Sequence, residues 1–228
     1  MKLGPMALVF ASLYLPVSVL GQRQPKNEEV VVSAGMDLYR AGGYQDNSGG
    51  VPPAVYVFPA KAGRVLAFPE IAGKWTCTSS VALYGPDGDT AIDACNPRAN
   101  ISSPIGPFSG YDLTDFTGGL AGMFLEDSLP TSAPSPLRFY VSDSSQGGIP
   151  TDFQILSPLI GQVFFIGDGL TGTGAGTHQQ FIVPATATRL YLGYVDSCSA
   201  SGDARPGCYG DNSGTITVIL QLHAAGQN

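Results

Sequence analysis

Arg189-Leu-Tyr-Leu-Gly-Tyr-Val-Asp196 is a short run of aliphatic, aromatic and β-branched residues, and Thr215-Ile-Thr-Val-Ile-Leu220 is a second. A stretch rich in Gly, Ser, Asp and Pro separates the two runs. β-Branched and aromatic residues favour extended strands, whereas clusters of Gly, Pro, Asp and Asn favour turns. The pair therefore predicts two β-strands joined by a long loop.

Further runs of the same kind recur along the chain at spacings of about ten residues. They are Val30–Ser33, Ala54–Phe58, Arg64–Ile71, Ser79–Tyr84, Leu120–Leu125, Leu137–Val141, Gln162–Ile166 and Gln179–Val183. No capped stretch with a helical period of 3.6 residues competes with them. The pattern predicts an all-β fold: one antiparallel domain over residues 29–224, a β-sandwich of the jelly-roll kind or a barrel, with long loop insertions at 90–117 and 126–136.

The composition agrees with this fold class and excludes one class of partner. The 228 residues include 30 Gly and 18 Pro, and only 13% are charged. The formal net charge is −7, and the 11 Lys and Arg residues are scattered singly along the chain. Because a surface that binds phosphates needs clustered basic side chains, we expect no nucleic-acid partner.

The N-terminus has the features of an export signal. Lys2 is followed by a mostly apolar run of about 15 residues that ends in small residues near Gly21. We expect residues 1–21 to be a signal peptide and residues 22–28 a flexible leader. An uncleaved membrane anchor is the alternative, but the run is shorter than the roughly 20 residues that a spanning helix needs. The mature chain is thus expected to be extracellular or periplasmic, without a membrane span.

The four cysteines are expected to form disulfides, because exported chains fold under oxidising conditions. They lie at Cys77, Cys95, Cys198 and Cys208, and no close pair of the kind that zinc requires is present. Three connectivities are open, and local pairing of Cys77 with Cys95 and Cys198 with Cys208 is the preferred one.

Acidic and amide side chains gather at the loop between the two quoted strands. Asp196 ends the first strand, and Asp211-Asn212 comes just before the second. If the strands are neighbours in a sheet, the three side chains meet at one edge. Carboxylate, amide and backbone oxygens are the ligands that Ca²⁺ prefers, at about 2.3–2.6 Å. The alternative is that Asp-Asn-Ser-Gly is only a favourable turn that opens a strand.

The loop and its flanks resemble the galactophilic calcium lectins of the bacterial PA-I type, which are small β-sandwiches. Pro206-Gly-Cys-Tyr-Gly-Asp-Asn-Ser-Gly-Thr215 is similar to the calcium loop of that family. Trp75-Thr-Cys-Thr78 with Tyr84-Gly-Pro-Asp-Gly-Asp89, Gly119–Leu125, and Phe181–Ala185 with Arg189–Asp196 match in the same order, so the resemblance covers about residues 55–222.

The resemblance implies a calcium site that is also a sugar site. The side chains of Asp196, Asp211 and Asn212 would bind Ca²⁺ together with the main-chain oxygens of Cys208 and Thr78. Two sugar hydroxyls complete the coordination in that family, and Asp89 and Tyr209 are the expected sugar-binding residues here. The family's sugar-contacting His and Gln are missing from Thr90-Ala-Ile-Asp-Ala-Cys95, so the carbohydrate partner is a galactoside or another glycan.

Catalysis is not expected. His178 and His223 are isolated in the sequence, and neither a G-x-S-x-G nor an H-E-x-x-H motif is present. Asp87, Asp89 and Asp93 lack the ligand order of an EF-hand and are interpreted as a solvated turn. The prediction is a secreted, calcium-dependent, carbohydrate-binding protein. A structural or adhesive exported sandwich is the alternative, a glycoside hydrolase is a more distant one, and the sequence leaves homo-oligomer formation open.

Overall fold

The structure is a computed structural model that describes residues 26–59, 64–78, 83–88, 100–114, 118–141, 147–198 and 206–224. The expected signal peptide, residues 1–21, lies outside these ranges. Within them the chain is all-β, as predicted, with one short 3-10 helix, η1 (Leu38–Gly43). No helix in the described part of the chain is long and apolar enough to cross a membrane.

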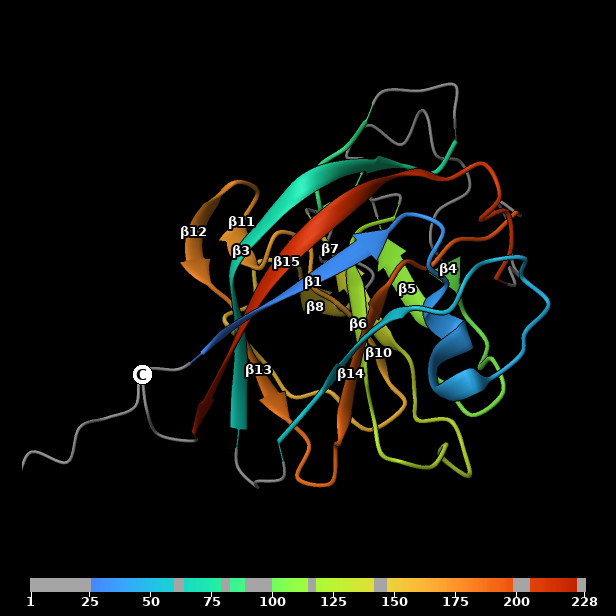
Figure 1. Cartoon of the computed structure of the whole chain (residues 1–228), viewed down its shortest axis with the longest axis horizontal. Coiled ribbons are helices and arrows are strands. Elements are labelled where there is room, and N and C mark those ends of the chain that lie inside the picture. Colours follow the sequence, from blue (N-terminus) through green and yellow to red (C-terminus); the bar gives the residue numbers. More distant parts are fainter. Residues whose placement is uncertain are drawn as a thin grey trace, which may run out of the picture.

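The largest sheet has the strand order β1-β15-β3-β13-β9, and Figure 1 labels its strands β1, β15, β3 and β13. Its strands are β1 (Asn27–Ser33), β15 (Ser213–Ala224), β3 (Arg64–Thr76), β13 (Gln180–Val183) and β9 (Ile155–Leu156). Neighbours are antiparallel, except that β9 runs parallel to β13. Residues 27 and 28, expected in the flexible leader, belong to β1, because the long strand β15 continues far enough to pair Asn27 with Gln221.

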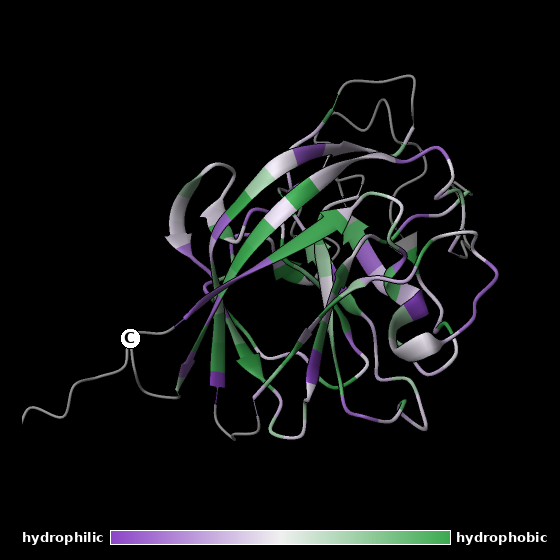
Figure 2. Cartoon of the chain, in the orientation of Figure 1, coloured by the Kyte–Doolittle hydropathy of each residue, from purple (hydrophilic) through white to green (hydrophobic). Residues whose placement is uncertain are grey.

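A second, antiparallel sheet with the order β10-β6-β14-β2 packs against the first. It comprises β10 (Val163–Phe165), β6 (Ala121–Leu125), β14 (Arg189–Gly193) and β2 (Ala54–Val57). Phe164 meets Phe181 of the first sheet with ring centroids 5.4 Å apart. Figure 2 shows hydrophobic residues concentrated in the strands and polar residues in the connections. Burial of such rings is the dominant stabilising contribution to the sandwich.

A third layer covers the other face of the second sheet. It consists of β4 (Asn100–Ile101), β5 (Tyr111–Thr114), β7 (Leu137–Tyr140) and β8 (Ile149–Pro150), and β5, β7 and β8 pair in parallel. Phe139 of this layer lies 6.1 Å from Phe165, centroid to centroid. All five residues of β6 are therefore buried. Residues 100–114, expected within a surface insertion, instead supply part of the core.

A separate hairpin and one long connection lie outside the three sheets. Strands β11 (Leu170–Gly172) and β12 (Ala175–His178) form a hairpin of their own that stands beside β3 (Figure 1). The chain from the end of β14 to the start of β15 carries the candidate metal residues. Residues 126–136 form no helix or strand.

Candidate functional site

The strand before Asp196, β14, and the strand after Asn212, β15, are not neighbours in one sheet. β14 pairs with β2 and β6, whereas β15 pairs with β1 and β3 in the opposite sheet. The premise that the strands pair is therefore wrong. The two residues are nevertheless brought together, because the chain after β14 folds back across the end of the sandwich.

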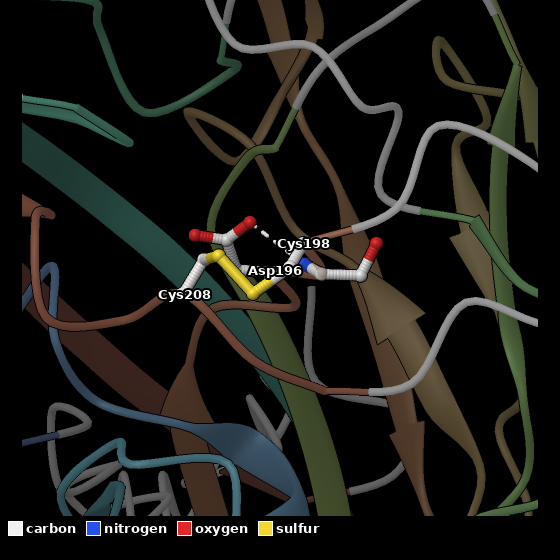
Figure 3. Close-up of a disulfide and its surroundings, with 4 residues drawn as sticks. Asp196, Cys198 and Cys208 are labelled. Atoms are coloured by element: carbon white, nitrogen blue, oxygen red, sulfur yellow. Dashed lines mark hydrogen bonds between the residues drawn. A yellow bond between two sulfur atoms is a disulfide. The ribbon is translucent and has the colours of Figure 1, made fainter.

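Three contacts fix this return of the chain. Ser197 forms an antiparallel bridge with Pro206, and the Gly207 N–H donates to the carbonyl oxygen of Asp196 over 3.1 Å. Cys198 and Cys208 form the predicted disulfide, with their Cα atoms 5.2 Å apart (Figure 3). Cys77 is disulfide-bonded as well. Its expected partner, Cys95, lies outside the described residues.

Two side-chain oxygens at this end of the sandwich are buried without a hydrogen-bond donor. Asp196 Oδ1 accepts from the Ser197 N–H over 2.7 Å (Figure 3), but Asp196 Oδ2 has no partner in the described structure. Asn212 Nδ2 donates to the Ala34 carbonyl over 3.1 Å, and Asn212 Oδ1 has no partner either. Because a buried acceptor without a partner costs about 1–3 kcal/mol, both oxygens are suited to bind a cation.

The electrostatics show that Asp196, Asp211 and Asn212 are close enough to interact. Burial raises the pKa of Asp196 to about 6, and the charge of Asp211 adds to that rise. The Asn212 side chain, although its Nδ2 donates to the Ala34 carbonyl, lies close enough to lower the pKa of Asp196, and the Ser197 N–H lowers that pKa as well. Among the described residues no lysine or arginine forms an ion pair with Asp196. A divalent cation would supply the missing positive charge.

The expected main-chain ligands lie in different surroundings. Cys208 is exposed and has a positive φ of 59°. The carbonyl oxygen of Thr78 already accepts a hydrogen bond from the Thr76 hydroxyl over 2.9 Å, which leaves one lone pair. Since Thr76 pairs with Ser213, the end of β3 lies beside the start of β15 and its Asn212. The carboxylates of Asp196 and Asp211 and the amide oxygen of Asn212 are oxygen ligands of the kinds that Ca²⁺ takes in proteins.

Tyr209 has a different role from the expected sugar contact. Its side chain is 3% exposed, so its ring offers no face on which a sugar can stack. Its hydroxyl donates to Asp37 Oδ1 over 3.0 Å and accepts from the Asp196 N–H over 3.0 Å. Tyr209 thus holds the backbone of Asp196 in place. Asp89, the other expected sugar-binding residue, lies outside the described residues.

Asp37 was not among the expected site residues. It is fully buried, and its carboxylate accepts from the Tyr39 N–H and from the Ser48 hydroxyl. Burial, followed by interaction with the Asp46 carboxyl, holds the pKa of Asp37 well above its usual range. Two similar segments, Tyr44-Gln-Asp-Asn-Ser-Gly49 and Tyr209-Gly-Asp-Asn-Ser-Gly214, each contribute a side chain that bonds to Asp37, namely Ser48 and Tyr209.

Comparisons with known proteins identify no relative. The chain matches no protein-family model, no curated protein and no solved structure. Within the described ranges, no group of three or more His, Cys, Asp and Glu side chains is arranged to hold a metal. The candidate set differs from such a group, because one of its three side chains is an asparagine.

Proposed function

We propose that this chain is an exported β-sandwich protein that binds Ca²⁺ at Asp196, Asp211 and Asn212 and uses the ion to bind carbohydrate hydroxyls. The observation that carries the proposal is the pair of buried oxygens without donors, Asp196 Oδ2 and Asn212 Oδ1. The disulfide between Cys198 and Cys208 supports export, because such bonds persist in oxidising compartments.

The exposure of the loop supports a role in ligand binding. Asp211 and Cys208 are exposed, whereas Asp196 and Asn212 are half-buried. An ion held between them would have protein oxygens on one side and solvent on the other. Ca²⁺ takes about 6–8 oxygen ligands, so its remaining positions would be filled by water or by a pair of sugar hydroxyls.

Calorimetric titration with Ca²⁺ and with Mg²⁺ tests the metal site. We expect Ca²⁺ to bind more tightly, because the site offers a flexible set of oxygens rather than a compact octahedron. Asp211→Ala should weaken Ca²⁺ binding by at least about tenfold, since it removes a carboxylate. Asp127→Ala is the matched control, because Asp127 is exposed and forms its ion pair with Arg189, at the other end of β14. Equal Ca²⁺ affinity in all three chains would overturn the site.

A glycan array with and without chelator tests the carbohydrate step. We expect binding that disappears on chelation, returns with Ca²⁺ and is lost in Asp211→Ala. Calcium binding without any array signal would make the ion structural and overturn the carbohydrate proposal. Turnover of a polysaccharide would instead indicate an enzyme.

A further inference from the structure

Two cavities lie side by side on the outer face of the five-stranded sheet. One, of about 370 Å³, is lined by residues of β3, β12, β13 and β15, and the other, of about 410 Å³, lies against the β11–β12 hairpin. Pro69 and His178 line both cavities. The two hollows therefore form one groove that follows β3 from Val65 to Ile71. Each volume is in the range of small-molecule sites, about 300–1,000 Å³.

A β-bulge and a pinned hairpin shape the groove. Ile219 pairs with Glu70 and Gln221 with Ala67, so β3 carries an extra residue where Pro69 lies. A bulge is a position at which a central strand tolerates proline, and it increases the local twist. On the hairpin side, Asp168 Oδ1 accepts from the Leu170 N–H over 2.9 Å. The backbone N–H of Asp168 itself donates to Asp87 Oδ1 over 2.8 Å.

The lining carries amide and imidazole side chains in one half of the groove and carboxylates in the other. Gln180, Gln221, His178 and His223 surround an apolar floor in the first half, which brings together the chain's two histidines from distant positions. Glu70, Asp87, Asp168 and Thr173 line the second half. Asp87, which the sequence suggested was part of a solvated turn, is 9% exposed, and burial raises its pKa to about 6.

The lining and the sheet topology exclude several classes of ligand. No lysine or arginine is among the described residues that line either cavity, which disfavours nucleic acids and other polyanions. β3 is paired with β15 along the groove and with β13 over residues 64–67, so an added peptide strand finds no free backbone edge of β3 in the first half of the groove. Carboxylates at the wall disfavour aliphatic chains.

Among the remaining classes of ligand, a neutral polymer rich in hydroxyl groups matches the side chains that line the groove. Each hydroxyl can donate to a carboxylate or an amide oxygen and accept from an amide or imidazole N–H. The apolar floor formed by Val65, Ala67 and Pro69 can contact the C–H faces of sugar rings. The length of β3 along the groove, six steps of about 3.3 Å from Val65 to Ile71, accommodates several sugar units in a row.

We propose that this groove binds a neutral polysaccharide without the help of a metal ion. It shares no residue with the calcium loop: β15 leaves that loop at Ser213 and meets the groove between Val218, which pairs with Ile71, and His223, ten residues and roughly 33 Å from Ser213. The inference does not depend on calcium binding. A chain with both sites would contact glycan at two separate sets of residues, and simultaneous engagement strengthens attachment to a polymer.

Affinity electrophoresis in gels that contain a soluble polysaccharide, with chelator present throughout, tests the groove. The neutral probes are a β-1,3-glucan, a xyloglucan and a galactomannan, and polygalacturonate is the anionic comparison. We expect at least one neutral probe to retard the protein, with an affinity that falls about tenfold in the double variant His178→Ala/Gln221→Ala. Glu70→Gln should also weaken binding, and its folding is not at risk because Glu70 is exposed.

Asp211→Ala is the matched control, because it disables the proposed calcium loop and leaves the groove intact. It should be retarded as strongly as the unmodified chain. The proposal that the groove binds a neutral polysaccharide is overturned if no neutral probe binds or if only polygalacturonate binds. It is also overturned if Glu70→Gln and the double variant bind the neutral probes as strongly as the unmodified chain. Retardation that is absent in chelator, appears in a parallel gel with Ca²⁺ and is lost in Asp211→Ala would instead assign the glycan to the loop.

Discussion

The hydroxyl of Tyr209 donates a hydrogen bond to Oδ1 of Asp37, 3.0 Å away, although the two residues are separated by 172 positions in the chain. The same hydroxyl accepts from the N–H of Asp196 over 3.0 Å. One buried side chain therefore connects the segment after β1 to the loop that carries the candidate metal ligands. The position of Asp196 depends on this connection as much as on β14.

Replacing Tyr209 with Phe should lower the free energy of unfolding by about 1–3 kcal/mol, because it leaves the carboxylate of Asp37 and the N–H of Asp196 without that partner. Urea denaturation measures the loss. Tyr111→Phe is the matched control: Tyr111 is equally buried, but its hydroxyl has no hydrogen-bond partner in the described structure. Equal stability of the two variants would contradict a structural role for the Tyr209 hydroxyl.

Stability should fall as the pH rises from mildly acidic to neutral. Burial raises the pKa values of Asp87 and Asp196 to about 6 and that of Asp37 above its usual range. In the unfolded chain an aspartate has a pKa of about 4. At pH values between this pKa and the higher pKa of the folded state, the folded chain binds more protons than the unfolded chain, so a rise in pH favours unfolding. We expect a loss of roughly 2–4 kcal/mol between about pH 4.5 and about pH 7.5 in chelator.

Urea unfolding at both pH values measures this slope. Asp87→Asn should flatten it, because the amide does not titrate, while its oxygen can still accept from the Asp168 N–H as Asp87 Oδ1 does. A stability that is constant or that increases toward neutral pH would show that the buried carboxyls do not control folding.

The strands that could be predicted from the sequence are those with several consecutive apolar or β-branched residues. β14 and β15 are examples, since each presents a continuous run bounded by turn residues. β4 and β9, with two residues each, could not be predicted, because so short a strand has no periodicity of its own. These short strands are defined by their partners: β9 pairs with β13 at the edge of the largest sheet, and β4 pairs with β5 in the third layer.

The candidate site was only partly predictable, for a related reason. Local chemistry identified Asp196, Asp211 and Asn212, but the mechanism that joins them was misassigned to sheet pairing between β14 and β15. The structure joins them through the fold-back at Ser197 and Pro206. The burial of Tyr209 could not be predicted, because its partner Asp37 lies in a segment with no local relation to the loop.

Removing the disulfide should weaken both stability and calcium binding. Cys198 and Cys208 close a loop with a sequence separation of 10 residues. Loss of this cross-link should cost about 2–3 kcal/mol, chiefly through the greater freedom of the unfolded chain. The double variant Cys198→Ser/Cys208→Ser, followed by urea denaturation and calcium titration, measures both effects. Unchanged calcium affinity in a folded double variant would show that the bridge does not position the ligands.

Asp196→Asn should change the melting temperature in opposite directions with and without Ca²⁺. In chelator near pH 7.5, the amide removes a buried charge and offers the oxygen of Asn212 a donor, so the variant should be more stable by about 1 kcal/mol. With saturating Ca²⁺, the original chain gains the free energy of ion binding, whereas the variant has lost a charged ligand and gains much less.

Melting curves of both chains with chelator and with Ca²⁺ therefore decide whether the Asp196 carboxylate is kept for a metal ion. Asp127→Asn is the control. Asp127 is exposed, and its ion-pair partner Arg189 lies at the end of β14 opposite the loop, so this substitution should shift neither curve. If Asp196→Asn lowers the melting temperature equally in both conditions, the carboxylate serves only the fold through its bond to the Ser197 N–H. A reversal of sign has no such structural explanation, because a hydrogen bond to the backbone is indifferent to Ca²⁺.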